Sequence, residues 1–380
     1  MLGEGRSGGF QTAWTGLRSD GRREAVQVSQ WMMWQRRLVG MRPAMGLAIV
    51  GLFLRVFAVA EAASPPALRG LVMGETVPHR IAKADTFIAL AARYDVGYMA
   101  LRAANPDVDP WVPPEGRVIR IPTRHVVPFA HGARIVINRA FLLLYHYDER
   151  GRLQHVFPVS LGREGLATPV GEIRISARVA GPSWYPTAAH RRENPSLPRV
   201  VPPGPDNPLG AFALRLGRTS YLIHGTNKPL SIGRRVSRGC IRLAPADIRT
   251  LFAAAGKGDL VRIVDAPMMV GVDPHDQRIH VEIAPSAYQQ ALLDDGKAMP
   301  ADPLLDAETL LEQAVPRKLW KKIAWTEVKR AAHRRAGIPT PVSQPLTAAE
   351  MRLFLDAEGT SDDVLAASPN ASHAAKTSGR

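Results

Sequence analysis

A series of short apolar segments separated by glycine and proline turns limits what residues 131–266 can fold into. Segments of this kind favour a β-sandwich or barrel. One helix is expected, at 245–255, where Pro245 stands at the start and Gly256 follows the end. The expected strands are 134–137, 141–145, 153–160, 171–176, 211–215, 221–224 and 259–264. We therefore predict a mainly β domain, a β-sandwich with a short helix.

The proline-rich stretch 182–208 interrupts these strands. It contains Trp184, Tyr185 and Pro186. Loops of this length inside a compact domain are uncommon and are usually functional. We interpret the stretch as a functional loop or lid.

The chain has a single cysteine, Cys240, which follows His224 in a glycine-flanked run. A thiolate attacks carbonyl groups, and a neighbouring histidine suits the task of accepting the thiol proton. Backbone N–H groups of the loop from Ser237 to Cys240 would stabilise an oxyanion, with Gly239 permitting close approach. These residue types indicate acyl transfer through a thioester.

Other interpretations of this pair stay open at the level of residue types. Cys240 also fits a small buried hydrophobe, and His224 a histidine satisfied at the end of a strand. One cysteine and one histidine without further ligand spacing make a poor zinc site. We predict no metal and no organic cofactor.

The N-terminal segment 1–62 is expected to contain a secretory signal peptide. Basic residues at 36–42 precede the apolar run 45–54, and small residues follow at 58–62. The run is short for a membrane span and ends at Arg55, although an uncleaved inner-membrane anchor stays an alternative. We therefore expect export from the cytoplasm; the periplasm as the destination is implied only by the family resemblance described below.

The formal net charge of +15 is the usual sign of a nucleic-acid partner. Export argues against that partner, because the anionic surfaces outside the cytoplasm are membrane lipids and wall polymers. The charge is also spread along the chain. We interpret it as attraction to an anionic wall or membrane surface, with simple solubility as the alternative, and predict no nucleic-acid partner.

Residues 77–124 predict a small strand–helix–helix–strand (βααβ) module. Asp85-Thr86 can cap the first helix, and Asn105-Pro106 ends the second. The helices are expected at 87–94 and 98–104, and a closing strand at 118–121. This block resembles a LysM domain, although Lys83-Ala84 replaces the glycine usual before the Asp-Thr pair. The resemblance implies binding to peptidoglycan glycan strands, and a spacer that binds nothing is the alternative.

The run from His224 to Leu243 resembles the signature of the L,D-transpeptidase (YkuD) family. That signature is a His-Gly pair, a spacer, and Ser-x-Gly-Cys with Asn or Arg two residues on. This chain supplies His224, Gly225, Ser237, Gly239, Cys240 and Arg242 in that order. The resemblance covers roughly 131–266 and is closest to the LysM-containing periplasmic members.

By that resemblance, Cys240 is the nucleophile and His224 its base, with the imidazole oriented by the carbonyl of Gly225. The N–H of Cys240, with Gly239 nearby, would stabilise the oxyanion. Arg242 would hold a substrate carboxylate.

Three further positions belong to the implied substrate site. Ser237 is expected to shape the loop. Arg238 stands where many members have a second histidine, and a cation beside the thiol should favour the thiolate; a solvated loop charge is the alternative. Tyr221 is interpreted either as lining the cleft or as a strand core residue.

The implied reaction uses the tetrapeptide stem of peptidoglycan. Cys240 attacks the carbonyl of the third residue and expels the terminal D-alanine, and an amine then takes the acyl group. An amine of another stem peptide gives a 3–3 cross-link, and a lysine of an outer-membrane lipoprotein attaches that protein to the wall. Water as acceptor makes an L,D-carboxypeptidase. The alternative from another class is a non-catalytic peptidoglycan-binding structural protein.

Residues 267–345 are expected to form a helical C-terminal extension. Basic helices are predicted over 307–336, interrupted at Pro316. We expect them to pack on the parent domain; contact with the membrane or wall is the alternative. Residues 359–380 are rich in Ala, Ser, Asp and Gly and are predicted to be disordered.

Overall fold

The structure is a computed structural model that describes residues 67–301 and 305–356. The expected signal segment within 1–62 and the predicted tail 359–380 lie outside these residues. No helix in the described part of the chain combines the length and apolar character needed to cross a bilayer. The described residues form a large sheet, a second mixed sheet with helices, and a small βααβ module.

The large sheet has eight strands in the order β13-β11-β10-β9-β14-β5-β6-β7. Its strands are β5 (Ile135–Asn138), β6 (Leu143–Tyr147), β7 (Leu153–Pro158), β9 (Gly171–Ala180), β10 (Phe212–Leu216), β11 (Leu222–His224), β13 (Ile241–Arg242) and β14 (Leu260–Val264). The mainly β prediction is confirmed. The strands form one continuous hydrogen-bonded sheet, in which residues 171–174 of β9 pair with β14 and residues 175–180 pair with β10. β14 makes it continuous, because it pairs in parallel with β5 and antiparallel with β9.

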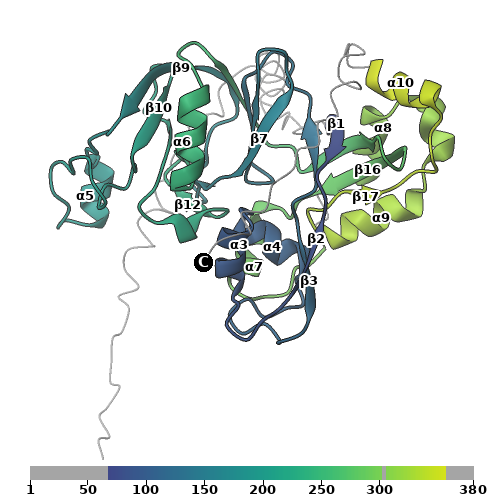
Figure 1. Ribbon diagram of the computed structural model, residues 1–380, viewed down its shortest axis with the longest axis horizontal. Helices are drawn as coiled ribbons and strands as arrows, with labels where there is room; N and C mark the ends of the chain where they lie inside the picture. Colours follow the sequence, from purple (N-terminus) through teal and green to yellow (C-terminus); the bar gives the residue numbers. More distant parts are fainter. Residues whose placement is uncertain (1–66, 302–304, 357–380) are drawn as a thin grey trace, which may run out of the picture. The chain divides into compact units, whose positions relative to one another are not determined.

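Helix α6 (Pro245–Ala254) packs against this sheet next to β10 (Figure 1). Its Ile248 and Leu251 are fully buried in the same cluster as Ile223 of β11 and Ile241 of β13. Burial of large aliphatic side chains of this kind stabilises the fold by about 1.5–3 kcal/mol each. The core therefore fixes β11 and β13 from the α6 side.

The βααβ module pairs β2 (Val77–Arg80) with β3 (Val118–Ile121) in antiparallel fashion. Between them lie α3 (Phe87–Arg93) and α4 (Tyr98–Ala104). Thr86 caps α3, since its side-chain oxygen accepts the N–H of Ala89 at 3.3 Å. The module packs on the segment before β12 (Arg235–Ser237), where the N–H of Met99 donates to the carbonyl of Gly233 at 3.2 Å.

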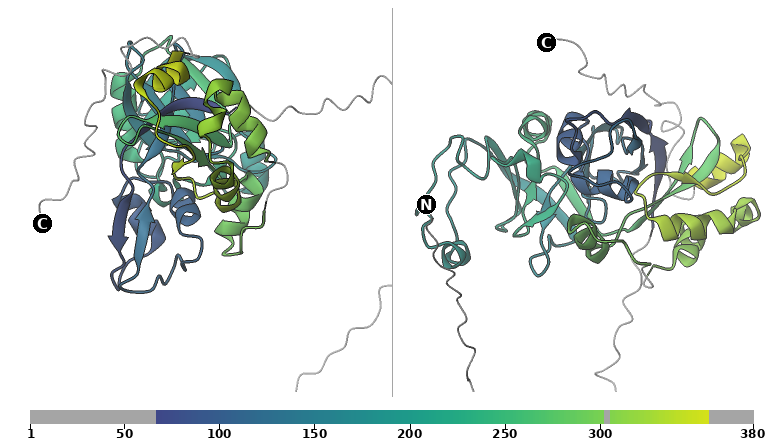
Figure 2. Two further views of the ribbon diagram at one scale, coloured as in Figure 1. Left: turned by 90° about the vertical axis from the view of Figure 1, so that its right-hand side faces the viewer. Right: turned by 90° about the horizontal axis from the view of Figure 1, so that it is seen from below.

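The second sheet has five strands in the order β17-β16-β15-β1-β4. They are β1 (Leu68–Met73), β4 (His125–Pro128), β15 (Met268–Asp273), β16 (Arg278–Ile283) and β17 (Thr340–Pro341). The helices that follow β16 are α7 (Ala287–Asp294), α8 (Ala307–Ala314), η3 (Arg317–Lys322), α9 (Trp325–Arg334) and α10 (Ala348–Asp356). α8 contacts β15 and α9 contacts β16, an arrangement that can be followed in Figure 2.

The sequence predicted a helical C-terminal extension, but the extension also contains β-strands. Its strands β15 and β16 are almost wholly buried and pair with each other, and β15 also pairs in parallel with β1 from the other end of the described chain. Pairing with so distant a segment leaves no local sequence signal.

Candidate active site

Strand pairing puts His224, Cys240 and Arg242 on one face of the large sheet. β11 and β13 run in parallel, with Ile223 opposite Ile241 and His224 opposite Arg242. Side chains alternate between the two faces of a strand, so Cys240, just before β13, shares a face with Arg242. The two isoleucines point the other way, into the core, where both are 0% exposed.

The imidazole of His224 is buried and held in one orientation. Its Nδ1 donates to the carbonyl oxygen of Gly225 at 2.6 Å, which leaves Nε2 as the unprotonated nitrogen of the neutral ring. Burial lowers the pKa of His224 to about 4, and the positive charge of Arg242 acts in the same direction. A neutral ring with a free Nε2 lone pair can accept a proton at neutral pH.

The thiol of Cys240 is partly buried, and its Sγ lies 3.8 Å from the carbonyl oxygen of Ser220. Burial raises the pKa of the thiol, while the Leu222 backbone N–H and the charge of Arg242 partly offset this rise. Because the pKa of His224 is lowered and that of Cys240 is raised, the resting pair is a neutral thiol and a neutral imidazole. A thiol in this state has to give up its proton before it can act as a nucleophile.

Ser237 and Gly239 set the shape of the loop that carries the thiol. The buried Ser237 hydroxyl donates to the carbonyl of Cys240 at 2.6 Å and accepts the N–H of Gly239 at 3.1 Å. Gly239 has a φ of +106°, and a Cβ there would lie 2.6 Å from Cε1 of Tyr221. The Gly239 N–H is thus used inside the loop, and the residue is needed for its conformation and its packing on the ring of Tyr221.

Arg242 is partly buried, and its Nε has no hydrogen-bond partner. No ion pair joins it to a carboxylate anywhere in residues 67–301 or 305–356. Its backbone is fixed by two hydrogen bonds of 2.9 Å with Ser160. A guanidinium that is partly desolvated and lacks a counter-ion is suited to binding a carboxylate of a ligand.

The sequence profile of the YkuD family, described as the L,D-transpeptidase catalytic domain, matches residues 132–263. The Escherichia coli K12 protein named "Probable L,D-transpeptidase YcfS" is 40% identical over 245 residues, which cover 62% of this chain and 76% of that protein. "Probable L,D-transpeptidase ErfK/SrfK" of Salmonella typhimurium is 34% identical over 260 residues, 67% of this chain and 82% of that protein. The chain belongs to the L,D-transpeptidase family.

Arg238 does not lie against the thiol of this L,D-transpeptidase in the way the sequence suggested. Its guanidinium pairs with the carboxylate of Glu193, which also accepts from Arg163 at 2.8 Å. The cation that partly offsets the burial-induced rise in the pKa of Cys240 is Arg242 instead. Arg238 therefore joins the loop from Ser237 to Cys240, which we call the catalytic loop, to the 182–208 segment.

The 182–208 segment carries α5 (Ala188–Glu193) and is closed at its base. Trp184 and Val201 exchange two backbone hydrogen bonds of 2.9 Å. The side-chain amide of the fully buried Asn207 donates to the carbonyl of Pro182 at 2.7 Å. These bonds give the segment a fixed conformation. Through the Arg238–Glu193 ion pair it lies next to the catalytic loop, and we call the 182–208 segment the lid.

Two lid residues, His190 and Glu193, were not among the predicted site residues. Thr187 with a hydrogen-bonding residue three positions later is the spacing of a capping box, and this signal could have located the short helix. The two arginine partners of Glu193 are remote in sequence, so their convergence could not have been predicted.

A cavity of about 510 Å³ lies at the base of the lid. Neither Cys240 nor Arg242 lines it. Its lining residues are Ala180, Gly181, Pro203, Gly204, Pro205, Asn207, Gly210, Ala211, Phe212, Thr226 and Asn227. The cavity therefore borders the loop after His224 without including the thiol.

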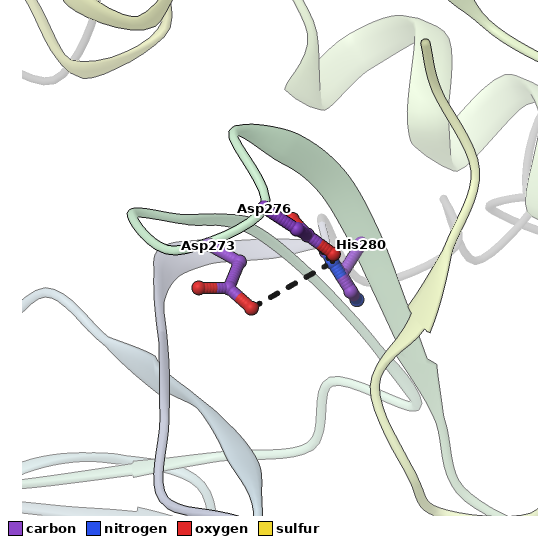
Figure 3. A group of neighbouring side chains, drawn as sticks. All are labelled: Asp273, Asp276 and His280. Atoms are coloured by element: carbon purple, nitrogen blue, oxygen red, sulfur yellow. Dashed lines mark hydrogen bonds and ion pairs between the residues drawn. The ribbon is translucent and has the colours of Figure 1, made fainter. Parts of the chain in front are cut away.

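One group within the described ranges has metal-ligand chemistry: Asp273, Asp276 and His280 of the β15–β16 hairpin (Figure 3). His280 Nε2 lies 2.9 Å from Asp276 and 4.0 Å from Asp273. The Arg124 guanidinium already pairs with the Asp273 oxygen that faces His280. The second nitrogen of His280 also lacks the hydrogen bond that metal-bound histidines usually make. The group is better explained as ion pairing within the hairpin.

Proposed function

We propose that this L,D-transpeptidase acts on peptidoglycan stem peptides through a thioester on Cys240, with His224 as the base. The observation that carries the proposal is the shared sheet face of His224, Cys240 and Arg242. It lies within the part of the chain that matches the catalytic domain.

In the first step, the sulfur of Cys240 attacks the carbonyl carbon of the third stem residue as its proton passes to Nε2 of His224. The tetrahedral oxyanion is stabilised by the N–H of Cys240. When the C–N bond breaks, His224 returns that proton to the leaving amine of D-alanine. The hydrogen bond from Nδ1 to Gly225 O supports this role, because it keeps the ring in the required tautomer through both transfers.

In the second step, a primary amine attacks the thioester and gives its proton to His224, and the Cys240 thiol is restored as the new amide forms. The amine of a second stem peptide yields a 3–3 cross-link, and the lysine of an outer-membrane lipoprotein offers the same chemistry. Water in place of the amine gives the carboxypeptidase reaction.

Arg242 is the group we assign to the carboxylate of the donor peptide, because it lacks a protein counter-ion. Ser237, Gly239 and Tyr221 hold the loop that presents the thiol. Arg238 contributes by its ion pair with Glu193, which holds the lid next to the catalytic loop.

The βααβ module is proposed to be a LysM-type unit that binds the glycan strands of the wall. Its loop between α4 and β3 exposes Trp111, with 56% of its surface accessible. Asp109 holds this loop by accepting the N–H groups of Trp111 and Val112 at 2.8 and 2.9 Å. An exposed indole on a fixed loop is suited to stacking on a sugar ring.

We further propose that the protein works in the periplasm after export by its N-terminal segment. The wall substrate and the basic run before residues 45–54 support this. N-terminal sequencing of the protein from the periplasmic fraction tests the proposal; a mature chain beginning near residue 63 is expected, and a cytoplasmic protein with an intact N-terminus would contradict it.

The test of the catalytic proposal measures D-alanine release from a purified disaccharide-tetrapeptide, with and without an amine acceptor. Wild type should release D-alanine and form an amide with the acceptor, and Cys240→Ala should do neither. Equal release by the two proteins would contradict the thioester mechanism.

A further inference from the structure

The lid carries a histidine, His190, whose ring is fixed by the lid itself. Its Nδ1 accepts the backbone N–H of Thr187 at 3.2 Å, and the His190 N–H donates back to the Thr187 hydroxyl at 3.3 Å. The Trp184 ring packs edge-on against it, with centroids 5.3 Å apart. The imidazole is therefore held in one place by the helix cap and by the packing of the Trp184 ring.

These contacts decide which nitrogen of His190 carries the proton. A backbone N–H can only donate, so Nδ1 must be the acceptor and the neutral ring must be protonated at Nε2. The ring thus offers a hydrogen-bond donor on the side opposite its cap.

Two ion pairs bring this helix to the catalytic loop. Glu193 lies three residues after His190, hence on the same side of α5. Its carboxylate pairs with Arg238, two residues before the nucleophile, and with Arg163 at 2.8 Å. His190 is thereby placed beside the loop that ends in Cys240.

The charges around His190 keep its ring neutral. Burial lowers the pKa of His190, the positive charges of Arg238, Arg242 and Arg163 lower it further, and Glu193 partly offsets them. The ion pair of Arg238 with Glu193 is the contact that brings these charges next to α5. A neutral Nε2–H donor is thus available there at physiological pH.

We propose that His190 is a substrate-contacting residue, whose Nε2–H donates a hydrogen bond to a carbonyl or carboxylate oxygen of the acyl-donor peptide lying between the lid and Cys240. The inference rests on the proposed function, which supplies the donor peptide. The Glu193 ion pairs with Arg163 and Arg238 position α5 for this contact.

Replacements of His190 distinguish the proposed hydrogen bond to the substrate from the role of this residue in capping α5. Both Gln and Glu can cap the helix from this position by accepting the Thr187 N–H. Only Gln also keeps a side-chain donor. Ala188→Glu is the control for added negative charge, because it lies on the same helix without forming the cap.

The experiment measures KM and kcat for D-alanine release from the soluble tetrapeptide, together with the alkylation rate of Cys240 by iodoacetamide and the melting temperature. We expect His190→Glu to raise KM about tenfold and His190→Gln to recover most of that loss. Ala188→Glu should leave KM unchanged. Thiol alkylation and melting temperature should be nearly the same in all the proteins.

Wild-type KM in both the Gln and the Glu variants would overturn the proposal, since it would leave His190 with a capping role alone. Equal loss in both variants would also overturn it, because the amide keeps a donor. A wild-type protein that releases no D-alanine would instead contradict the proposed function, so the two failures are distinguishable.

Discussion

His224 and Arg242 lie directly opposite each other on the parallel strands β11 and β13. Burial and, after it, the charge of Arg242 keep the imidazole neutral, while burial keeps the Cys240 thiol protonated. In the proposed mechanism, the Cys240 thiolate of this L,D-transpeptidase is therefore generated during the attack, and we expect no thiolate–imidazolium pair in the resting enzyme.

The pH dependence of thiol alkylation tests this resting state. The rate of Cys240 alkylation by iodoacetamide should rise with pH to beyond the ordinary cysteine pKa of about 8.5, since only the thiolate reacts. A plateau reached below pH 7 would mark a preformed ion pair and contradict the account. A short peptide with one free cysteine is the reference.

The acid limb of the kcat/KM profile tests the base. With the pKa of His224 lowered to about 4, the imidazole stays neutral and able to accept a proton well below pH 6.5. We expect activity to fall only as the pH approaches 4. A half-maximal point near 6.5 would mean that the ring titrates as an exposed histidine does.

Replacement of Arg242 tests its proposed carboxylate contact. Arg242→Gln should raise KM for the tetrapeptide by about 10- to 100-fold, the loss expected for a hydrogen bond to a charged group. Arg174→Gln, an exposed arginine on β9 that bonds to the carbonyl of Gly258, is the matched control and should have little effect. An unchanged KM in Arg242→Gln would remove the residue from substrate binding.

Alanine substitutions at two glycines with similar φ angles distinguish the cost of backbone strain from the cost of steric crowding at the catalytic loop. Gly239 and Gly258 have φ of +106° and +96°, but only at Gly239 would a Cβ meet a side chain, that of Tyr221 at 2.6 Å. Gly258→Ala should cost about 1–2 kcal/mol of unfolding free energy and leave activity intact. Gly239→Ala should cost more and abolish most D-alanine release. The unfolding free energies are measured by urea titration and the activities by D-alanine release. Equal values for the two alanine variants would contradict this description of the loop.

The sequence predicted the local parts of this fold well. The expected strands at 134–137 and 259–264 correspond to β5 and β14, and the expected helix at 245–255 corresponds to α6. In each case the residues that predict the element lie within it or directly beside it, such as Gly258 before β14 and Pro245 and Gly256 at the ends of the helix, so the information is local. The continuous sheet was not predicted, because it depends on β14 pairing with both β5 and β9.

The candidate site shows the same division. The run from His224 to Arg242 could be found because its spacing is contained in one stretch of sequence. The ion-pair partner of Arg238 could not be predicted, because that partner is Glu193, which lies on a lid helix with no apolar periodicity. β15 and β16 were missed for a related reason: β15 pairs with β1, far away in the chain.

The most direct test of the central claim is the intact mass of the enzyme during turnover of a tetrapeptide donor in the absence of an amine. We expect an added mass equal to the donor minus D-alanine, located by peptide mapping to Cys240 and absent from Cys240→Ala. D-alanine release by wild type with no such adduct, or an adduct on another residue, would contradict it.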